Sequence, residues 1–252
     1  MSAFFLSIII PAHNEENRLP ATLEQVARFI RAQPYASEVL IVENGSHDNT
    51  LKIAQEFAER NAGFRAIHET GRGKGLAIQR GMLEAQGDYR FMCDADLSMP
   101  IDEISRFLPP VLPDADIAVA SREAPGAVRY HEPTYRHLGG RAINTIIRWL
   151  VLPGLQYTQC GFKCFRADVA QDLFPYQTLK GWSFDIEILF IARQRAYRIV
   201  EIPIPWYFNP DSKLHAVNDA LRMGMDIVRI RRNAMQGLYK SIPPADRTPT
   251  KI

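Results

Sequence analysis

The sequence predicts a single α/β domain, built on a mostly parallel sheet with helices on both faces. Short apolar runs and segments of helical period alternate along the first half of the 252-residue chain, and the loops between them are short. Such alternation requires crossover connections, which bury a parallel sheet between helices. Hydrophobic residues make up 46% of the chain, enough to fill the core of such a domain.

The predicted strands of the first half are short runs rich in β-branched residues, and the first of them ends at Pro11. They cover residues 6–10, 38–42, 64–67, 89–93 and 116–120. The predicted helices between them have apolar residues three or four positions apart. They cover residues 19–32, 48–60, 74–85 and 101–108. We expect Ser46 or Asp48 to cap the second of these helices.

The regular alternation fails after Arg122. From there we expect a loop, a helix, a strand, a helix, a strand and a final long helix, in that order. They cover residues 123–133, 134–150, 160–165, 183–195, 198–202 and 214–236. The last twelve residues, 241–252, include three prolines and have little to bury, so a loose tail is predicted there.

The last predicted helix is amphipathic and basic. Residues 213–240 contain six Lys and Arg against two Asp. One side of the helix is predicted to hold Leu221, Met225 and Val228, and the other Arg222, Asp226 and Arg229. We expect the apolar side to pack on the domain. A second interpretation, which is compatible with the first, places the helix on an anionic membrane surface.

Composition excludes several classes of protein. A net charge of only +2 disfavours a nucleic-acid-binding protein, which usually has a large basic excess. Cys93, Cys160 and Cys164 have no paired spacing for disulfides or zinc, so buried thiols are expected. Neither a signal peptide nor a transmembrane helix is predicted. The expected location is the cytoplasm, either in solution or peripherally on the cytoplasmic face of a membrane.

Polar residues follow four of the predicted strands, at the edge where ligands bind in open α/β sheets. These clusters are residues 11–16, 43–48, 94–98 and 121–122. The sharpest is Asp94-Ala95-Asp96, whose two carboxylates could share a hard cation such as Mg²⁺ or Mn²⁺ with a diphosphate. An ordinary turn or helix cap is the alternative interpretation of these two acids.

Two further patterns favour binding of anions. The run Gly71-Arg72-Gly73-Lys74-Gly75 precedes a predicted helix, where glycines and a helix N-terminus can approach a phosphate. It is neither a Walker loop nor a dinucleotide fingerprint, and a basic turn is the alternative. Four arginines with a planar fork suited to phosphate follow the fifth strand, and solvated surface is their alternative: Arg122, Arg129, Arg136 and Arg141.

These motifs together resemble family 2 glycosyltransferases, and within them the dolichyl-phosphate β-glucosyltransferase and polyprenyl-phosphate mannosyltransferase group. The matching segments are LSIIIPAHNEENRLPATL, VENGSHDNT, GRGKGLAIQRGM, GDYRFMCDADLSMP, ASREAPGA, TQCGFKCF and WSFDIEILFIA. The resemblance covers residues 5 to about 235, and the last two segments resemble the glucosyl branch in particular. The resemblance implies a glycosyltransferase-A fold and an inverting, metal-dependent reaction with a nucleotide-sugar donor.

The resemblance also implies a role for individual residues. Carried over by position, the nucleotide-sugar site would comprise Pro11, His13, Glu15, Val42, Asn44, Lys74, Asp94, Ala95 and Asp96. Asp94 and Asp96 would hold Mg²⁺ or Mn²⁺, with Ser98 as a third polar ligand. Arg122 and Arg136 would bind an acceptor phosphate, and with the two acids they are the expected catalytic residues. Asp185 and Glu187 match an acidic patch of the glucosyl branch without an assigned role.

Three positions depart from the family pattern. Relatives commonly have two aspartates at Glu43-Asn44, many have tyrosine at His13, and an aspartate often stands where Tyr157 precedes TQCGF. Because a phosphate acceptor is already ionised at neutral pH, the reaction needs no base at that last position.

The expected domain covers residues 1–240. Its parts are a nucleotide-sugar half (1–122), an acceptor half (123–212) and the basic helix (213–240). The expected function is transfer of a hexose, with glucose from UDP-glucose favoured, to a polyprenyl or dolichyl phosphate. Three alternatives are a soluble acceptor, a GDP-mannose donor and a nucleotide-binding module without catalysis. The sequence does not indicate an oligomeric state.

Overall fold

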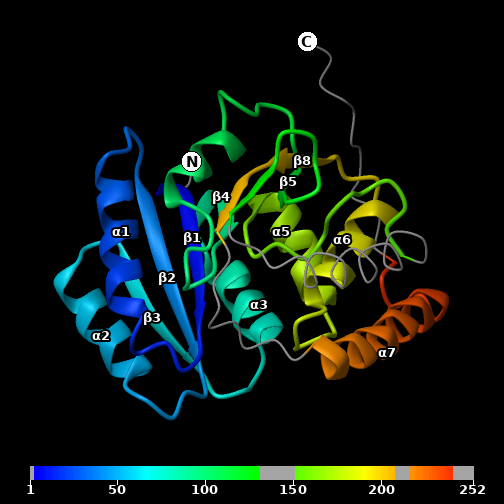
Figure 1. Cartoon of the computed structure of the whole chain (residues 1–252), viewed down its shortest axis with the longest axis horizontal. Helices are drawn as coiled ribbons and strands as arrows, with labels where there is room; N and C mark the ends of the chain where they lie inside the picture. The colour runs from blue at the N-terminus through cyan, green and yellow to red at the C-terminus, as the bar shows by residue number, and fades with distance from the viewer. Residues whose placement is uncertain (1–2, 131–150, 208–215, 241–252) are drawn as a thin grey trace.

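A computed structural model describes residues 3–130, 151–207 and 216–240 of the chain (Figure 1). Its centre is a seven-stranded sheet in the order β3-β2-β1-β4-β7-β5-β8. The parallel strands are β1 (Phe4–Ala12), β2 (Ser37–Asn44), β3 (Phe64–Glu69), β4 (Gly87–Met92), β5 (Ile117–Ser121) and β8 (Ile199–Pro203). Only β7 (Lys163–Arg166) runs antiparallel to its two neighbours, β4 and β5.

Helices connect the strands and cover both faces of this sheet (Figure 1). They are α1 (Leu19–Arg31), α2 (Thr50–Arg60), α3 (Lys74–Glu84), α5 (Ala167–Leu173), α6 (Phe184–Gln194) and α7 (Ala216–Met235). Two short 3-10 helices are η1 (Ile101–Phe107) and η2 (Phe174–Tyr176). A separate two-stranded ribbon pairs β6 (Val128–Tyr130) with β9 (Pro205–Tyr207).

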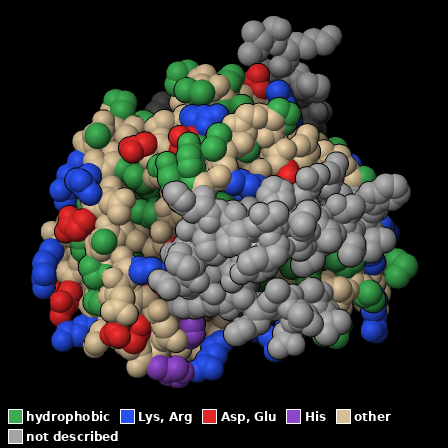
Figure 2. Space-filling view, viewed as in Figure 1, with side chains coloured by type: hydrophobic (Ala, Val, Ile, Leu, Met, Phe, Trp, Pro, Cys, Tyr) green, Lys and Arg blue, Asp and Glu red, His purple; other side chains and the backbone are tan. Residues whose placement is uncertain are grey.

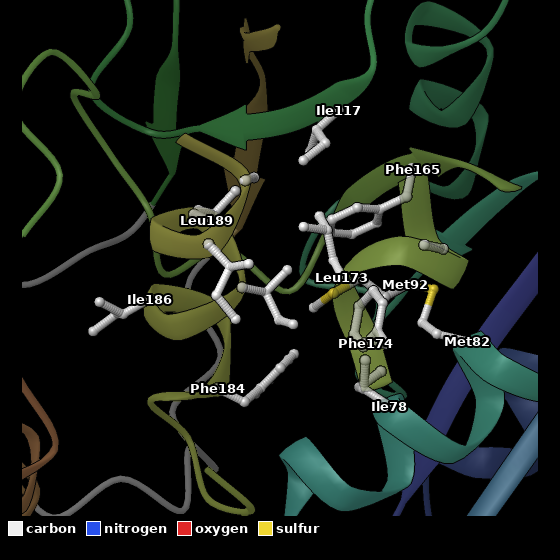
Figure 3. Close-up of a cluster of buried hydrophobic side chains, with 14 of the residues drawn as sticks. Ile78, Met82, Met92, Ile117, Phe165, Leu173, Phe174, Phe184, Ile186 and Leu189 are labelled. Carbon is white, nitrogen blue, oxygen red and sulfur yellow. The ribbon is translucent and has the colours of Figure 1, made fainter. Parts of the chain in front are cut away.

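The hydrophobic core has two layers because successive residues of a strand point to opposite faces of the sheet. In β1, Ile8 and Ile10 pack toward α1 and η1, whereas Ile9 between them packs toward α3. Figure 3 shows the second layer, where side chains of α3, α5 and α6 meet those of β4, β5 and β7. All three strand residues named here are fully buried, as a sheet covered on both faces requires.

The structure confirms the predicted alternation and the helices on both faces of a mostly parallel sheet. It corrects several details of the prediction. The segment 101–108 forms 3-10 helix rather than α-helix, and the N-cap of α2 is Asn49 rather than Ser46 or Asp48. Strand β6 lies inside the predicted loop 123–133, and α5 and β9 were not predicted. The predicted helix 134–150 and tail 241–252 lie outside the described residues.

The last helix exists as predicted, but the side that faces the domain is not the predicted one. The buried side of α7 carries Met223, Ile227 and Ile230, which share a cluster with the core of the sheet. Met225 and Val228, predicted to face the domain, are exposed instead. Apolar residues occur on both sides of this helix, and the side with Met223, Ile227 and Ile230 packs on the core.

Two expectations from composition concern the described part of the chain. All three cysteines are free and buried there, as predicted. None of the described helices combines the length and the apolar character that a bilayer span requires.

Candidate active site

The candidate site lies where the carboxyl ends of β1, β2 and β4 meet at one edge of the sheet. Because β7 is antiparallel to β4, with Met92 opposite Lys163, the residues just before β7 reach the same edge. This arrangement brings Cys160 and Gly161 beside the acids that follow β4. The sequence alone gave no indication of this approach, because it depends on strand direction rather than on local pattern.

The loops after β1 and β2 are tied to each other. The ring Nδ1 of His13 lies 2.8 Å from the Asn44 carbonyl oxygen, and the backbone N–H of Asn14 donates to Ser46 Oγ at 3.0 Å. Asn14 adopts a positive φ of 52°, which asparagine tolerates better than most residues. The two polar clusters therefore form one continuous wall. His13 serves this wall as a hydrogen-bonded residue in the described structure.

Glu43, one of the departures from the family pattern, is a buried carboxylate at the base of this wall. It accepts a hydrogen bond from the Ser46 backbone N–H at 2.5 Å, and its other oxygen lies 2.6 Å from His68 Nδ1. Burial alone would raise the pKa of Glu43, but these hydrogen bonds and the His68 charge outweigh burial and lower that pKa. Glu43 therefore remains ionised and fixes the loop that follows β2.

The acid Asp94 is paired with the lysine of the glycine-rich run. Lys74 Nζ lies 2.5 Å from Asp94 Oδ1, and both side chains are mostly buried. A Cβ on Gly161 would lie only 1.9 Å from Asp94 Oδ2, so the carboxylate occupies the space that a side chain there would fill. Sequence reasoning identified the acid and the lysine but missed Gly161, which sits inside the TQCGF segment.

The electrostatics of Asp94 fit a cation at this edge. Burial raises the pKa of Asp94, the Lys74 ammonium opposes this rise, and the neighbouring Asp96 carboxylate adds to it. For Lys74, burial would lower the pKa, but the Asp94 charge outweighs burial and raises it. The Asp94–Asp96 repulsion is the kind of excess negative charge that a hard cation relieves. Asp96 is further held by the Ser98 backbone N–H, which donates to Asp96 Oδ1 at 3.0 Å.

Within the described ranges, no three His, Cys, Asp or Glu side chains gather into a ready metal-ligand cluster. The acid pair Asp94 and Asp96 therefore fits a cation that takes its remaining ligands from a bound diphosphate or from water, as Mg²⁺ commonly does. Ala95 between them is buried, and its carbonyl oxygen accepts a 2.6 Å hydrogen bond from Thr22 of α1. This contact anchors the acid pair to α1, which packs in the same apolar layer as Ala95.

The glycine-rich run is supported from the opposite side by residues 179–181. The Leu76 N–H donates to the Lys180 carbonyl oxygen at 3.2 Å, and a Cβ on Gly73 would lie 2.1 Å from that same oxygen. Gly73 also has a φ of 129°, which other residues rarely adopt. Lys74 Nζ lies 4.8 Å from the centre of the Trp182 ring, a cation–π distance. The run is therefore a packed loop rather than a flexible basic turn.

Arg122, at the end of β5, is held between two aromatic rings. Its guanidinium carbon lies 4.5 Å from the ring centre of Tyr157 and 4.3 Å from that of Trp206. Tyr157, the most serious departure from the family pattern, therefore contacts the predicted acceptor-binding arginine. Stacking on aromatic faces fixes the plane of a guanidinium, a group whose planar geometry suits binding of phosphate. Arg129 donates to the Arg122 carbonyl oxygen at 3.1 Å and also forms an ion pair with Glu123.

The acidic patch without an assigned role divides into two parts. Asp185 forms a buried ion pair with Lys163, at 3.2 Å between Nζ and Oδ2. Glu187 is fully buried and accepts hydrogen bonds from the Thr178 hydroxyl, the Thr178 and Leu179 N–H groups and the Tyr239 hydroxyl, at 2.6 to 2.9 Å. Asp185 thus adds charge beside Lys74 and Asp94, whereas Glu187 fixes the segment that supports the glycine-rich run.

The remaining predicted residues take different positions. Pro11 lies within β1, one residue before the strand ends at Ala12, and Glu15 beyond it forms a two-point ion pair with Arg18, at 2.7 and 2.9 Å. The Val42 side chain is fully buried in the core, so only its backbone faces the strand end. Arg136 and Arg141 lie outside the described residues.

Comparison with known proteins gives consistent matches. The model of the family described as "Glycosyl transferase family 2" matches residues 7–174. The chain is 30% identical to a dolichyl-phosphate beta-glucosyltransferase of Dictyostelium discoideum, over 94% of this chain and 76% of that protein. It is 31% identical to a dolichyl-phosphate beta-glucosyltransferase of Saccharomyces cerevisiae, over 94% and 77%.

A solved structure shows the same fold. It is glucosyl-3-phosphoglycerate synthase from Mycobacterium tuberculosis, in complex with Mn²⁺, UDP and phosphoglyceric acid. The TM-score is 0.65 at 16% sequence identity, and the match covers 96% of this chain and 81% of that one. Identity this low establishes the architecture alone.

Proposed function

Because the chain belongs to glycosyltransferase family 2 and is a glycosyltransferase, we propose that it transfers glucose from UDP-glucose to a polyprenyl phosphate such as dolichyl phosphate. The observation that carries this proposal is the similarity to named dolichyl-phosphate beta-glucosyltransferases along 94% of the chain. Similarity that spans both the donor loops and the segments after β5 supports a shared acceptor as well as a shared fold. We propose residues 1–122 as the donor half, 123–212 as the acceptor half and 213–240 as an appended helix.

The donor would bind along the edge formed by the loops after β1, β2, β3 and β4. His13, Glu15 and Asn44, with the backbone at Pro11 and Val42, are proposed to line the nucleoside. Asp94 and Asp96, with Ser98 beside them, would hold Mg²⁺ or Mn²⁺, which supplies charge neutralisation on the diphosphate leaving group. Lys74 adds a second positive charge at the same place, on a packed loop that needs no reorganisation.

The acceptor would bind on the other side of the acid pair. Arg122 is held in plane by Tyr157 and Trp206, so its N–H edge is preorganised for phosphate oxygens. Arg136 is proposed as its partner. Burial raises the pKa of the Cys160 thiol, Arg122 and Lys163 oppose this rise, and Asp94 adds to it, so these charges surround one buried residue. Because the acceptor-side Arg122 and the donor-side Asp94 both act on Cys160, the acceptor phosphate would be positioned next to the donor diphosphate.

The proposed chemistry is an in-line displacement at the anomeric carbon. An oxygen of the acceptor phosphate forms the new bond to that carbon while the bond to the UDP oxygen breaks, and the configuration inverts. No proton must be removed because the attacking phosphate is already ionised at neutral pH. Because arginine holds the acceptor and lysine holds the leaving group, the attack becomes effectively unimolecular.

The direct test combines purified protein, Mg²⁺ or Mn²⁺, a polyprenyl phosphate and a panel of labelled UDP- and GDP-sugars. We expect label in the lipid only from UDP-glucose, and none in the presence of a chelator. Label from GDP-mannose would overturn the proposed donor. Slow release of free sugar with no labelled lipid would overturn the lipid acceptor and point to a soluble one.

Two substitutions test the metal role. Asp94→Ala and Asp96→Ala should each reduce turnover by about 10²-fold or more, because each removes a carboxylate from the cation site. The exposed Lys52→Ala on α2 serves as the control and should keep wild-type turnover. Unchanged turnover in both aspartate variants would exclude the proposed metal site.

A further inference from the structure

The outer face of α7 carries apolar side chains that the core does not use. Met225, Val228 and Met235 are 66%, 68% and 82% exposed, whereas Met223 and Ile230 on the opposite side are buried. Positions 225, 228 and 235 recur at helical spacing, so they lie on one stripe of the helix. The buried side of α7 makes the apolar contacts with the core. The exposed stripe is therefore available to contact another surface.

The same outer face is strongly basic. Arg222, Arg229 and Arg232 are exposed and form no hydrogen bond or ion pair in the part of the chain that the structure describes. Asp226 is the sole acid from residue 222 to residue 240. In Figure 2, basic and hydrophobic side chains lie next to each other along the edge where α7 runs, while both signs of charge mix around α1 and α2.

A groove lies between this face and the segment 178–181. It has a volume of about 420 Å³ and is lined by residues 178–181 on one side and by Arg222, Met225, Asp226 and Arg229 of α7 on the other. Its first wall is the segment that supports the glycine-rich run through Lys180. Arg222 and Arg229 outnumber Asp226 in this groove, so the α7 side of the groove has a net positive charge.

We propose that the outer face of α7, defined as Arg222, Met225, Val228, Arg229, Arg232 and Met235, docks on the surface of an anionic phospholipid bilayer. Exposed apolar side chains would enter the boundary between headgroups and acyl chains, and the flanking arginines would pair with lipid phosphates. Charge complementarity selects this occupant, because a protein partner would have to supply acids to match three exposed arginines. The proposal deepens the proposed function and rests on it, because a polyprenyl phosphate resides in a bilayer.

The test measures co-sedimentation of the full chain with vesicles of phosphatidylcholine alone or mixed with phosphatidylglycerol. We expect binding only to the anionic vesicles, weakened by added salt. The double variant Arg229→Gln/Arg232→Gln should weaken binding by about 30-fold, because each basic residue near the surface contributes about fivefold. Met225→Ser/Val228→Ser should also weaken binding. Lys52→Gln/Arg60→Gln, an equal loss of charge on α2, should leave it unchanged.

Three outcomes would overturn the proposal: no binding of the wild type to anionic vesicles, equal loss with the α2 control, or a stable dimer in solution that the α7 variants dissociate. A water-soluble short-chain prenyl phosphate separates this proposal from the proposed function. If both hold, the α7 variants glucosylate the soluble acceptor at the wild-type rate and lose activity only on acceptor embedded in vesicles. If the wild type glucosylates neither acceptor yet binds vesicles, the proposed function fails and the docking face stands.

Discussion

At the scale of single residues, the candidate site depends on neighbours that fix the positions of its charged side chains. Gly161 has no side chain, and the Asp94 carboxylate fills the place where its Cβ would be. Arg122 is held between two flat aromatic rings, those of Tyr157 and Trp206. Both arrangements hold a charged group in a defined direction, which is a requirement of a preorganised site.

Gly161→Ala tests the first arrangement. The new methyl group would displace the Asp94 carboxylate by at least an ångström, so we expect turnover to fall by about 10²-fold while the protein remains folded. Circular dichroism and initial rates measure the two effects. Gly181→Ala is the matched control, since a Cβ there meets no atom within 4 Å. Equal activity of the two variants would show that the position of Asp94 does not matter.

The buried Glu43 gives a prediction about pH. Its pKa is lowered in the folded protein, so its contribution to stability is fully present above its ordinary value of 4.5 and is lost as pH falls below that value. Between about pH 6 and about pH 3, Glu43→Gln should therefore reduce the slope of unfolding free energy against pH. Urea unfolding at several pH values measures this slope. Glu59→Gln, an exposed carboxyl on α2, should keep the wild-type slope.

At the scale of elements, one buried carboxylate joins three segments that are distant in sequence. Glu187 of α6 binds the segment that begins at Thr178, and it also binds Tyr239 beyond the end of α7. Asn233 of α7 completes the cluster, with its amide 3.1 Å from both the Thr178 and the Tyr239 hydroxyl oxygens. Through this cluster, α6 and α7 hold the segment on which the glycine-rich run rests.

Glu187→Gln should destabilise the fold by about 3 kcal/mol, because an amide cannot accept the four hydrogen bonds that the carboxylate accepts. Tyr239→Phe, which removes one hydroxyl from the same cluster, should cost about 1–2 kcal/mol. Chemical unfolding measures both losses. In the fraction of each variant that remains folded, we expect KM for the nucleotide-sugar to rise by a larger factor than kcat falls. An unchanged KM would mean that the cluster stabilises the fold without positioning the donor loop.

At the scale of the whole molecule, the sheet separates two apolar layers, and α7 belongs to one of them. Ile230 is fully buried in the same cluster as strand residues such as Ile117 and Phe165. The appended helix is therefore packed into the main core rather than attached to the surface. This packing supports the proposal of one domain over residues 1–240, with the described helices on both faces of one sheet.

Ile230→Ala should destabilise the whole domain by about 2–4 kcal/mol, since it leaves a cavity in the shared core. Unfolding curves from circular dichroism and tryptophan fluorescence should shift together. Val228→Ala on the exposed side of the same helix should change stability by less than about 0.5 kcal/mol. Separate transitions for the two probes would show that α7 unfolds independently of the sheet.

The sequence by itself determined the class of fold, the order of strands and helices in the first half, and most of the polar clusters. Period and alternation are local properties, and the carboxyl ends of parallel strands meet whatever the side chains are. Asp94, Asp96 and Lys74 could therefore be predicted as neighbours. The family resemblance, which the comparisons confirm, added the glycosyltransferase function.

Only the tertiary structure decided what lies across from these residues. The antiparallel course of β7 brings Gly161 to Asp94, and the pairing of β9 with β6 accompanies the stacking of Trp206 on Arg122. The core also decided which stripe of α7 is buried, and so exposed Met225 and Val228. Each of these outcomes depends on contacts between segments far apart in the chain, and no local period of the sequence encodes them.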